Sequence, residues 1–182
     1  MESAEHRLAA RARRAYEIGR LRWATRVAWI VLLLVAVSFA AVGGSPVSAA
    51  TGALLLVTAT ALRWRGGAAT AAAVRAGLAA GLIPFALLLT LKCGGALCMI
   101  GDCMTHCARF CAFGGLAAGV LLAVRARHHR DHVASFLIAA SAIAALTGLL
   151  GCFVGGLTGM AWMIMGELVA TLPAFAVELR RR

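Results

Sequence analysis

The sequence has few acidic residues, almost no lysine and little aromatic or polar character. Its 182 residues include only seven aspartates and glutamates, one lysine and three prolines, and charged residues make up 14% of the chain. Because about a quarter of the residues in a soluble domain are charged, a soluble globular fold is excluded. The 7% aromatic content and the lack of a basic run within a polar region argue against a nucleic-acid-binding surface. No hydrophilic stretch is long enough for a soluble catalytic domain.

Long apolar stretches account for most of the remaining sequence, in which 62% of the residues are hydrophobic. A helix needs about 20 residues, within a range of about 17–25, to cross the hydrocarbon core of a membrane. We therefore predict an all-α polytopic membrane protein whose six transmembrane helices occupy residues 27–177. The turn Gly-Gly-Ser-Pro predicts an N-cap at Ser45, with Pro46 in the first helical position and a tight hairpin between the first two helices. The apolar stretches cover residues 27–43, 47–62, 76–91, 110–124, 133–154 and 157–177.

The arginines predict the orientation of these helices. Sixteen of the eighteen basic residues precede the first span, flank the second and fourth connections or lie in the tail 178–182, and only Lys92 and Arg109 fall on the other side. Cytoplasmic loops carry the excess of Arg and Lys, so both termini are predicted to be cytoplasmic. The expected location is the cell inner membrane, with several crossings. The long basic region before residue 27 does not resemble a signal peptide, so the first span is expected to be retained.

The basic N-terminal segment 1–26 is the largest cytoplasmic surface that the sequence offers. It is rich in helix-forming residues and contains no proline, so it is expected to be helical when bound. It could bind a partner protein, or it could lie on anionic lipid as a positively charged flank. Trp23, Trp29 and Trp64 are predicted to be interfacial anchors. The candidate partner-binding residues are Arg7, Arg11, Arg13, Arg14, Tyr16 and Arg20.

Five of the six cysteines lie within nineteen residues at the outer ends of the third and fourth spans. Their spacing does not match a zinc ribbon or a ferredoxin. Three alternatives remain: a structural disulfide such as one from Cys93 to Cys98 or Cys103, a redox or soft-metal sensor, and simple packing between helices. The candidate thiol or metal residues are Cys93, Cys98, Cys103, His106, Cys107, Cys111 and Cys152.

Two other groups of polar residues lie in or near the apolar stretches. Glu167 falls within the last span, where a carboxylate costs about 2.5–3.5 kcal/mol to insert, so it should face the bundle. It is either a functional site or a hydrogen-bonding residue that fixes helix packing. The cluster His128, His129, Arg130, Asp131 and His132 could bind a metal but reads more simply as a solvated cytoplasmic turn.

Residues 85–177 resemble the six-helix inner-membrane anti-sigma factors, the negative-regulator-of-sigma and CarR-like group. In that group a His/Cys pair opens the fourth span, an arginine-rich turn follows, and Gly-Cys ends the fifth span. Here His106-Cys107-Ala-Arg-Phe-Cys111, Arg125-Ala-Arg127 and Gly151-Cys152 occupy these places. The last span of the group often carries Gly-His, whereas this chain has Gly166-Glu167, so a metal role for that position is in doubt.

The resemblance implies a regulator of transcription rather than an enzyme. Its cytoplasmic face would hold an alternative sigma factor of the extracytoplasmic-function (ECF) type at the membrane and release it on a signal such as light, an oxidant or a metal. No cofactor would be required, although a soft metal ion could bind, and the partners would be the sigma factor and the bilayer, with no direct nucleic-acid contact. The alternative is a soft-metal or thiol-dependent transporter or metal-resistance protein. A membrane enzyme lacks support, since no histidine box or pair of carboxylates is evident.

Overall fold

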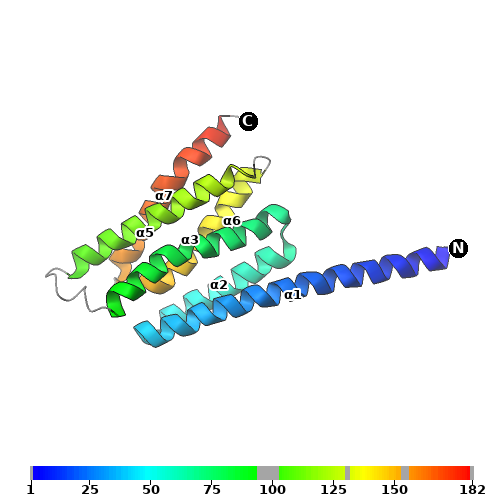
Figure 1. The fold of residues 1–182 in the computed structure, drawn as a ribbon, viewed down its shortest axis with the longest axis horizontal. Coiled ribbons are helices and arrows are strands. Elements are labelled where there is room, and N and C mark those ends of the chain that lie inside the picture. Colours follow the sequence, from blue (N-terminus) through cyan, green and yellow to red (C-terminus); the bar gives the residue numbers. More distant parts are fainter. Residues whose placement is uncertain (1, 94–102, 130–131, 153–155, 181–182) are drawn as a thin grey trace.

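The computed structural model describes residues 2–93, 103–129, 132–152 and 156–180, and within them the side chains other than those of residues 2–5, 7–10, 42, 91–93, 103–106 and 178–179. The described chain is entirely helical (Figure 1). Six helices are long and apolar enough to cross a membrane, which makes the chain a multi-pass membrane protein by length and composition. They are α1 (Glu2–Val42), α2 (Pro46–Arg65), α3 (Ala68–Cys93), α5 (Cys103–Ala126), α6 (Val133–Cys152) and α7 (Gly156–Leu179).

The turn between α1 and α2 forms as the sequence predicts. Gly43 adopts a positive φ of 89° directly after α1. Ser45 is the N-cap of α2, where its hydroxyl accepts a hydrogen bond from the Ser48 amide at 3.1 Å, and Pro46 occupies the first turn. The Ser45 amide in turn donates to the Ser48 hydroxyl at 3.3 Å, which completes a capping box. The two helices consequently pack against each other as a hairpin.

The bundle is built around two extensive helix pairs that are not neighbours in the sequence. Helix α5 packs along α7, and α3 packs along α6. Contacts between α3 and α5 join the two pairs, and α2 attaches the α1–α2 hairpin to α6 (Figure 1). One polar contact reinforces this attachment, because the buried Ser38 hydroxyl of α1 donates to the Leu150 carbonyl of α6 at 2.9 Å.

Glycines allow the paired helices to approach closely. A Cβ at Gly81 of α3 would lie 2.7 Å from the Ala144 carbonyl oxygen of α6, closer than real Cβ contacts. On α5, a Cβ at Gly115 would overlap the Met163 carbonyl oxygen of α7, and one at Gly119 would lie 2.7 Å from the Glu167 carbonyl oxygen. Gly115 and Gly119 form a Gly-xxx-Gly pair, the spacing that favours close helix contact in membranes. We infer that van der Waals contact at these glycines holds the bundle together.

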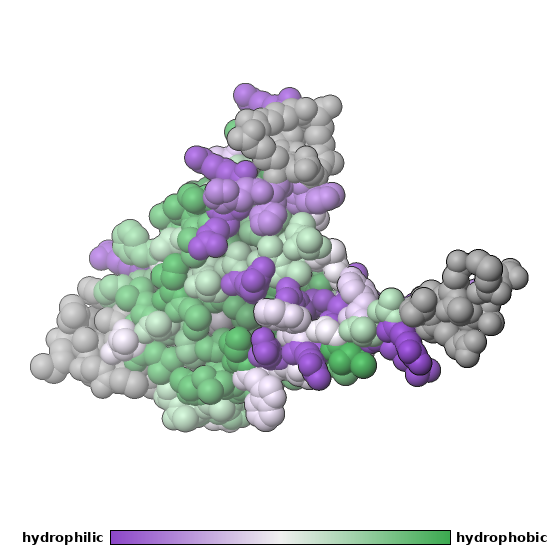
Figure 2. All heavy atoms as spheres, turned by 45° about the vertical axis from the view of Figure 1, so that its right-hand side comes forward, coloured by the Kyte–Doolittle hydropathy of each residue, from purple (hydrophilic) through white to green (hydrophobic). Residues whose placement is uncertain are grey.

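Both ends of the chain lie at the same end of the bundle. The α2–α3 and α5–α6 connections are found there too (Figure 1). Hydrophilic side chains gather in this region between the outer part of α1 and the end of α7, while the visible surface to the left of it is largely hydrophobic (Figure 2). The sidedness that the arginine distribution predicts is thus present in the fold, and assigning this end to the cytoplasm remains a prediction.

Candidate functional site

The N-terminal basic segment is an unbroken extension of the first span. Helix α1 runs from Glu2 to Val42 without interruption, and its first half projects beyond the other helices (Figure 1). Side chains 11–18 are all exposed, among them Arg11, Arg13 and Arg14. One ion pair is formed within the helix, from Arg13 Nε to Glu17 Oε1 at 3.9 Å, and it joins two exposed groups. Arg11, Arg13 and Arg14 are therefore exposed on the part of the helix that projects from the bundle.

Aromatic rings and arginines meet where this helix reaches the bundle. Two guanidinium groups lie over the Trp23 ring, with the Cζ atoms of Arg26 and of Arg63 of α2 at 5.1 Å and 5.2 Å from its centre. Arg63 also donates from Nη1 to the Ala71 carbonyl of α3 at 3.1 Å. These contacts tie α1 to the α2–α3 connection, and each cation–π contact contributes about 0.5–1 kcal/mol at an exposed site.

A cavity of about 430 Å³ opens beside this junction. Tyr16, Arg20, Trp23 and Arg63 line it together with the glycines of the α2–α3 connection. The Arg20 guanidinium lies 5.6 Å from the centre of the Tyr16 ring. Two of the predicted partner-binding residues, Tyr16 and Arg20, are thus brought to one hollow, whereas Arg11, Arg13 and Arg14 lie farther out on the helix, and the side chain of Arg7 is outside the described part of the structure.

Three sulfur atoms meet deep in the bundle. The Cys111 thiol of α5 donates to the Cys152 sulfur of α6 at 3.3 Å, and the Cys152 thiol donates to the Met163 sulfur of α7 at 3.5 Å. Cys107 and Leu88 belong to the same buried cluster. Cys111 and Cys152 have no solvent exposure, and a Cβ at Gly159 would lie 3.2 Å from the Cys111 sulfur. The cluster is therefore dry and tightly packed, and its cysteines come from two helices.

The structure does not describe the side chains of the other candidate thiol and metal residues. Cys98 lies outside the described residues, and the side chains of Cys93, Cys103 and His106 lie outside them as well. The predicted disulfides of the outer loop accordingly remain predictions. Within the described residues, no three His, Cys, Asp or Glu side chains are grouped so as to hold a metal ion. The soft sulfur ligands that lie together among the described residues are those of the buried cluster, where Cys111, Cys152 and the Met163 thioether are in contact.

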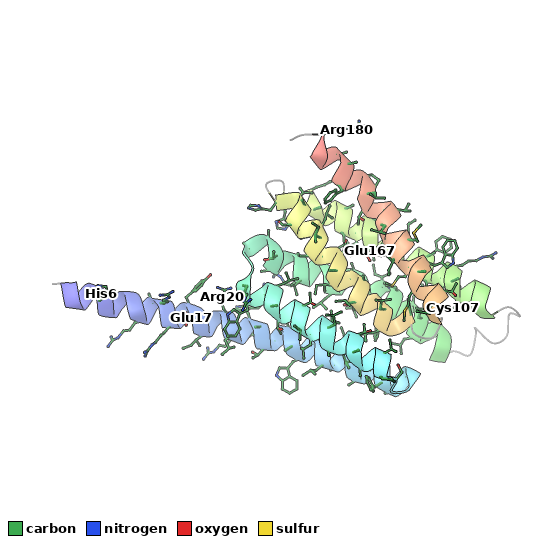
Figure 3. The ribbon with its side chains drawn as sticks, turned by 180° about the vertical axis from the view of Figure 1, so that it is seen from behind. His6, Glu17, Arg20, Cys107, Glu167 and Arg180 are labelled. Atoms are coloured by element: carbon green, nitrogen blue, oxygen red, sulfur yellow. The ribbon has the colours of Figure 1, made fainter. Side chains whose placement is uncertain are left out.

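Glu167 faces the interior of the bundle, as its position in the last span predicts. It lies within α7, between the Cys107 end of the bundle and the end that carries Arg180 (Figure 3). Only 4% of its surface is exposed, and its Oε1 atom has no hydrogen-bond partner among the described residues. Ser141 of α6 lies beside the carboxyl group. One carboxyl oxygen is thus buried without a partner, which costs free energy, while Ser141 is placed to hydrogen-bond the group, so both interpretations of Glu167, functional site and packing residue, stay predictions.

Sequence reasoning missed two features of these sites. Met163 gave no signal, because a methionine in an apolar span is ordinarily a packing residue. The role of Arg63 at the Trp23 junction could have been suspected from its place at the α2–α3 connection, opposite the tryptophan that precedes the first span.

Comparisons of the chain with protein-family models, curated proteins and solved structures find no match.

Proposed function

We propose that this protein is a membrane-bound anti-sigma factor of the inner membrane, which holds an ECF-type sigma factor on its N-terminal helix. The observation that carries the proposal is the projection of α1, whose exposed arginines extend beyond the bundle on a continuous helix. No other described element offers a comparable surface outside the apolar part of the bundle. A helix of this kind suits a partner with a groove and an acidic surface.

Charge supports the choice of an acidic protein as partner. The chain carries a formal net charge of +11, and the seven arginines before the first span are opposed by only three glutamates or aspartates in the same segment. Complementary charge speeds association and excludes partners of the wrong sign. The cavity beside Trp23 would receive a side chain of the bound partner, with Arg20 and Arg63 available to pair with a carboxylate.

The sulfur cluster is the proposed input of the signal. Oxidation of these two thiols, 3.3 Å apart, by hydrogen peroxide would give a disulfide and two water molecules, and because both sulfurs are buried it would require the packing around them to open. Such a bond would join α5 to α6 and alter how both pack against α7. A change in packing at this point would shift α6. Helix α2 packs against α6, and the Ser38 hydroxyl of α1 is hydrogen-bonded to it, so the shift would reach the first two helices.

Deletion of residues 2–22 tests the partner-binding step. The truncated chain keeps all six spans, so we expect it to insert normally while the sigma-dependent genes become constitutively expressed, as measured by transcript sequencing. Reversal of Arg11, Arg13 and Arg14 to glutamate should act in the same direction. Continued repression by the truncated protein at normal abundance would place the contact elsewhere or refute the anti-sigma role.

A matched control is available at the other end of the chain. Reversal of Arg180, Arg181 and Arg182 changes the charge by the same amount on the same side, and it should leave repression intact. Both reversals require a topology check, because they weaken the positive-inside signal. Reporter fusions at Gly66 and Arg182 should read cytoplasmic and a fusion at Gly95 external, and a cytoplasmic Gly95 would overturn the orientation.

A second candidate function is soft-metal or thiol-dependent transport, and the Cys111, Cys152 and Met163 contacts are the observation that favours it. Thiolate and thioether sulfurs are the ligands that Cu(I) prefers. Uptake of copper or mercury into vesicles containing the purified chain separates the two functions, because an anti-sigma factor would move neither ion.

A further inference from the structure

A second cavity lies at the arginine-bearing end of the bundle, apart from the N-terminal helix and the sulfur cluster. It measures about 450 Å³ and opens between α3, α5 and the start of α6. Its inner wall is apolar and made of small residues, chiefly Ala72 and Ala76 of α3 with Leu121 of α5. Alanines at these positions leave room that larger side chains would fill.

Basic side chains form the rim of this cavity. Arg75 comes from α3, Arg125 from the last turn of α5, and His128 and His129 from the α5–α6 connection. No acidic side chain is among the described residues that line it. The His129 ring stacks on Phe136 of α6, with ring centres 4.7 Å apart and an angle of 21° between the planes, which fixes that side of the rim.

No acidic side chain in the described part of the chain neutralises the two guanidinium groups. Among the described residues, neither Arg75 nor Arg125 forms an ion pair or a side-chain hydrogen bond. Arg75 is close enough to Arg63 for the two positive charges to interact. Two positive charges from different helices therefore line one cavity, and no described acidic side chain pairs with them. The cavity should accordingly attract an anion.

We propose that this cavity binds a phosphoryl group, presented either by the headgroup of an anionic phospholipid or by a soluble phosphate compound. Arginine matches the oxygens of a phosphate with paired N–H donors, and two arginines with two imidazoles supply donors for several oxygens. Basic pockets between membrane-spanning helices on the cytoplasmic side are known to take the headgroups of anionic lipids. The apolar wall formed by Ala72, Ala76 and Leu121 would contact the glycerol or upper acyl region of such a lipid.

The site has a structural consequence for the bundle. Arg75 belongs to the α3–α6 pair and Arg125 to the α5–α7 pair, so a phosphate between them would link the two pairs at their basic end. The two guanidinium groups come from different pairs, and no described acidic side chain bridges them. Occupancy of the site is therefore expected to raise the stability of the whole bundle.

Native mass spectrometry of the purified full-length chain tests the proposal. The detergent-solubilised protein is titrated with phosphatidylglycerol, with phosphatidylcholine, and with phosphatidylglycerol in the presence of millimolar inorganic phosphate. We expect phosphatidylglycerol to bind in preference to phosphatidylcholine. The Arg75→Gln/Arg125→Gln variant should bind it about tenfold more weakly, because charge-assisted hydrogen bonds to phosphate are lost.

The chain offers a closely matched control. Arg65 and Arg127 are exposed residues near the same two connections, and neither lines the cavity. The Arg65→Gln/Arg127→Gln variant removes the same charge and should retain wild-type binding. Ala76→Leu keeps every charge but fills the cavity, so it should weaken binding. Circular dichroism shows whether each variant is folded. If the glutamine variant is not, Arg75→Lys/Arg125→Lys keeps both positive charges and should bind phosphatidylglycerol with an affinity between those of the wild type and the glutamine variant.

Each outcome is decisive. Loss of binding in the cavity variants alone, without competition by inorganic phosphate, supports a lipid headgroup site. The same loss with competition by phosphate supports a site for a soluble phosphate compound. Equal binding by the wild type and the Arg75→Gln/Arg125→Gln variant would overturn the proposal, and so would an equal loss in the Arg65→Gln/Arg127→Gln control, since the binding would then follow the total charge.

Discussion

Replacement of Gly115 by alanine should loosen the α5–α7 interface. A Cβ at this position would overlap the backbone carbonyl oxygen of Met163, which cannot rotate away as a side chain could. Helix α7 must therefore retreat by roughly 1 Å, and a gap of that size loses a quarter to a half of the dispersion energy of each affected contact. Overpacking of this kind costs about 1–3 kcal/mol, and a clash with backbone belongs at the upper end.

The helix itself partly offsets this cost. Alanine is more favourable than glycine within a helix by about 0.5–1 kcal/mol, so the expected net loss in the free energy of unfolding is about 2 kcal/mol. The assay is titration of the detergent-solubilised protein with sodium dodecyl sulfate, followed by circular dichroism. Gly19→Ala is the matched control, because a Cβ at Gly19 meets no atom within 4 Å, and it should leave stability unchanged or raise it. A Gly115→Ala variant within about 0.5 kcal/mol of the wild type would refute close packing as the basis of this interface.

Three further changes can be measured with the same preparation. Ser45→Ala removes the N-cap of α2 and should lower the free energy of unfolding by about 1 kcal/mol; an unchanged value would mean that the capping box adds nothing to the hairpin. Glu167→Gln replaces a buried carboxyl group, one oxygen of which has no hydrogen-bond partner among the described residues, by a neutral amide, so stability should be equal or higher, and a loss of more than about 1 kcal/mol would show that the carboxyl group stabilises packing. Trp23→Leu removes both cation–π contacts, and tryptic cleavage after Arg22 should become several-fold faster; an unchanged rate would argue against the junction as the restraint on α1.

The six helices could be predicted from the sequence because their signals are local. Each apolar stretch corresponds to one helix, although the bounds differ, since α3 begins at Ala68 where the sequence predicted 76, and α1 begins at Glu2 where the sequence predicted 27. The Ser45 cap and Pro46 start were predicted because a serine side chain acts on its own helix end. The basic segment before residue 27 was set apart by its charge, whereas its backbone continues straight into the first span.

Which residues from different helices meet in the candidate sites could not be predicted in the same way. Cys111 and Cys152 are 41 residues apart, and they meet because α5 and α6 both pack near the start of α7. Hydrophobicity does not specify which spans pair in a bundle whose helices are apolar on most sides, because lipid is as good a neighbour as another helix. Which helices pair depends instead on close contacts at glycines. A stripe such as Gly115 and Gly119 predicts that another helix lies close to α5, but it does not predict which helix that is.

The continuity of α1 makes its outer half a lever. A straight helix rises about 1.5 Å per residue, so the tip at Glu2 lies about 32 Å beyond the junction at Trp23. A change of about 10° in the tilt of the first span would then move the tip by about 5–6 Å without unwinding the helix. A movement of the bundle that tilts the first span would therefore be transmitted along the unbroken helix to the exposed arginines.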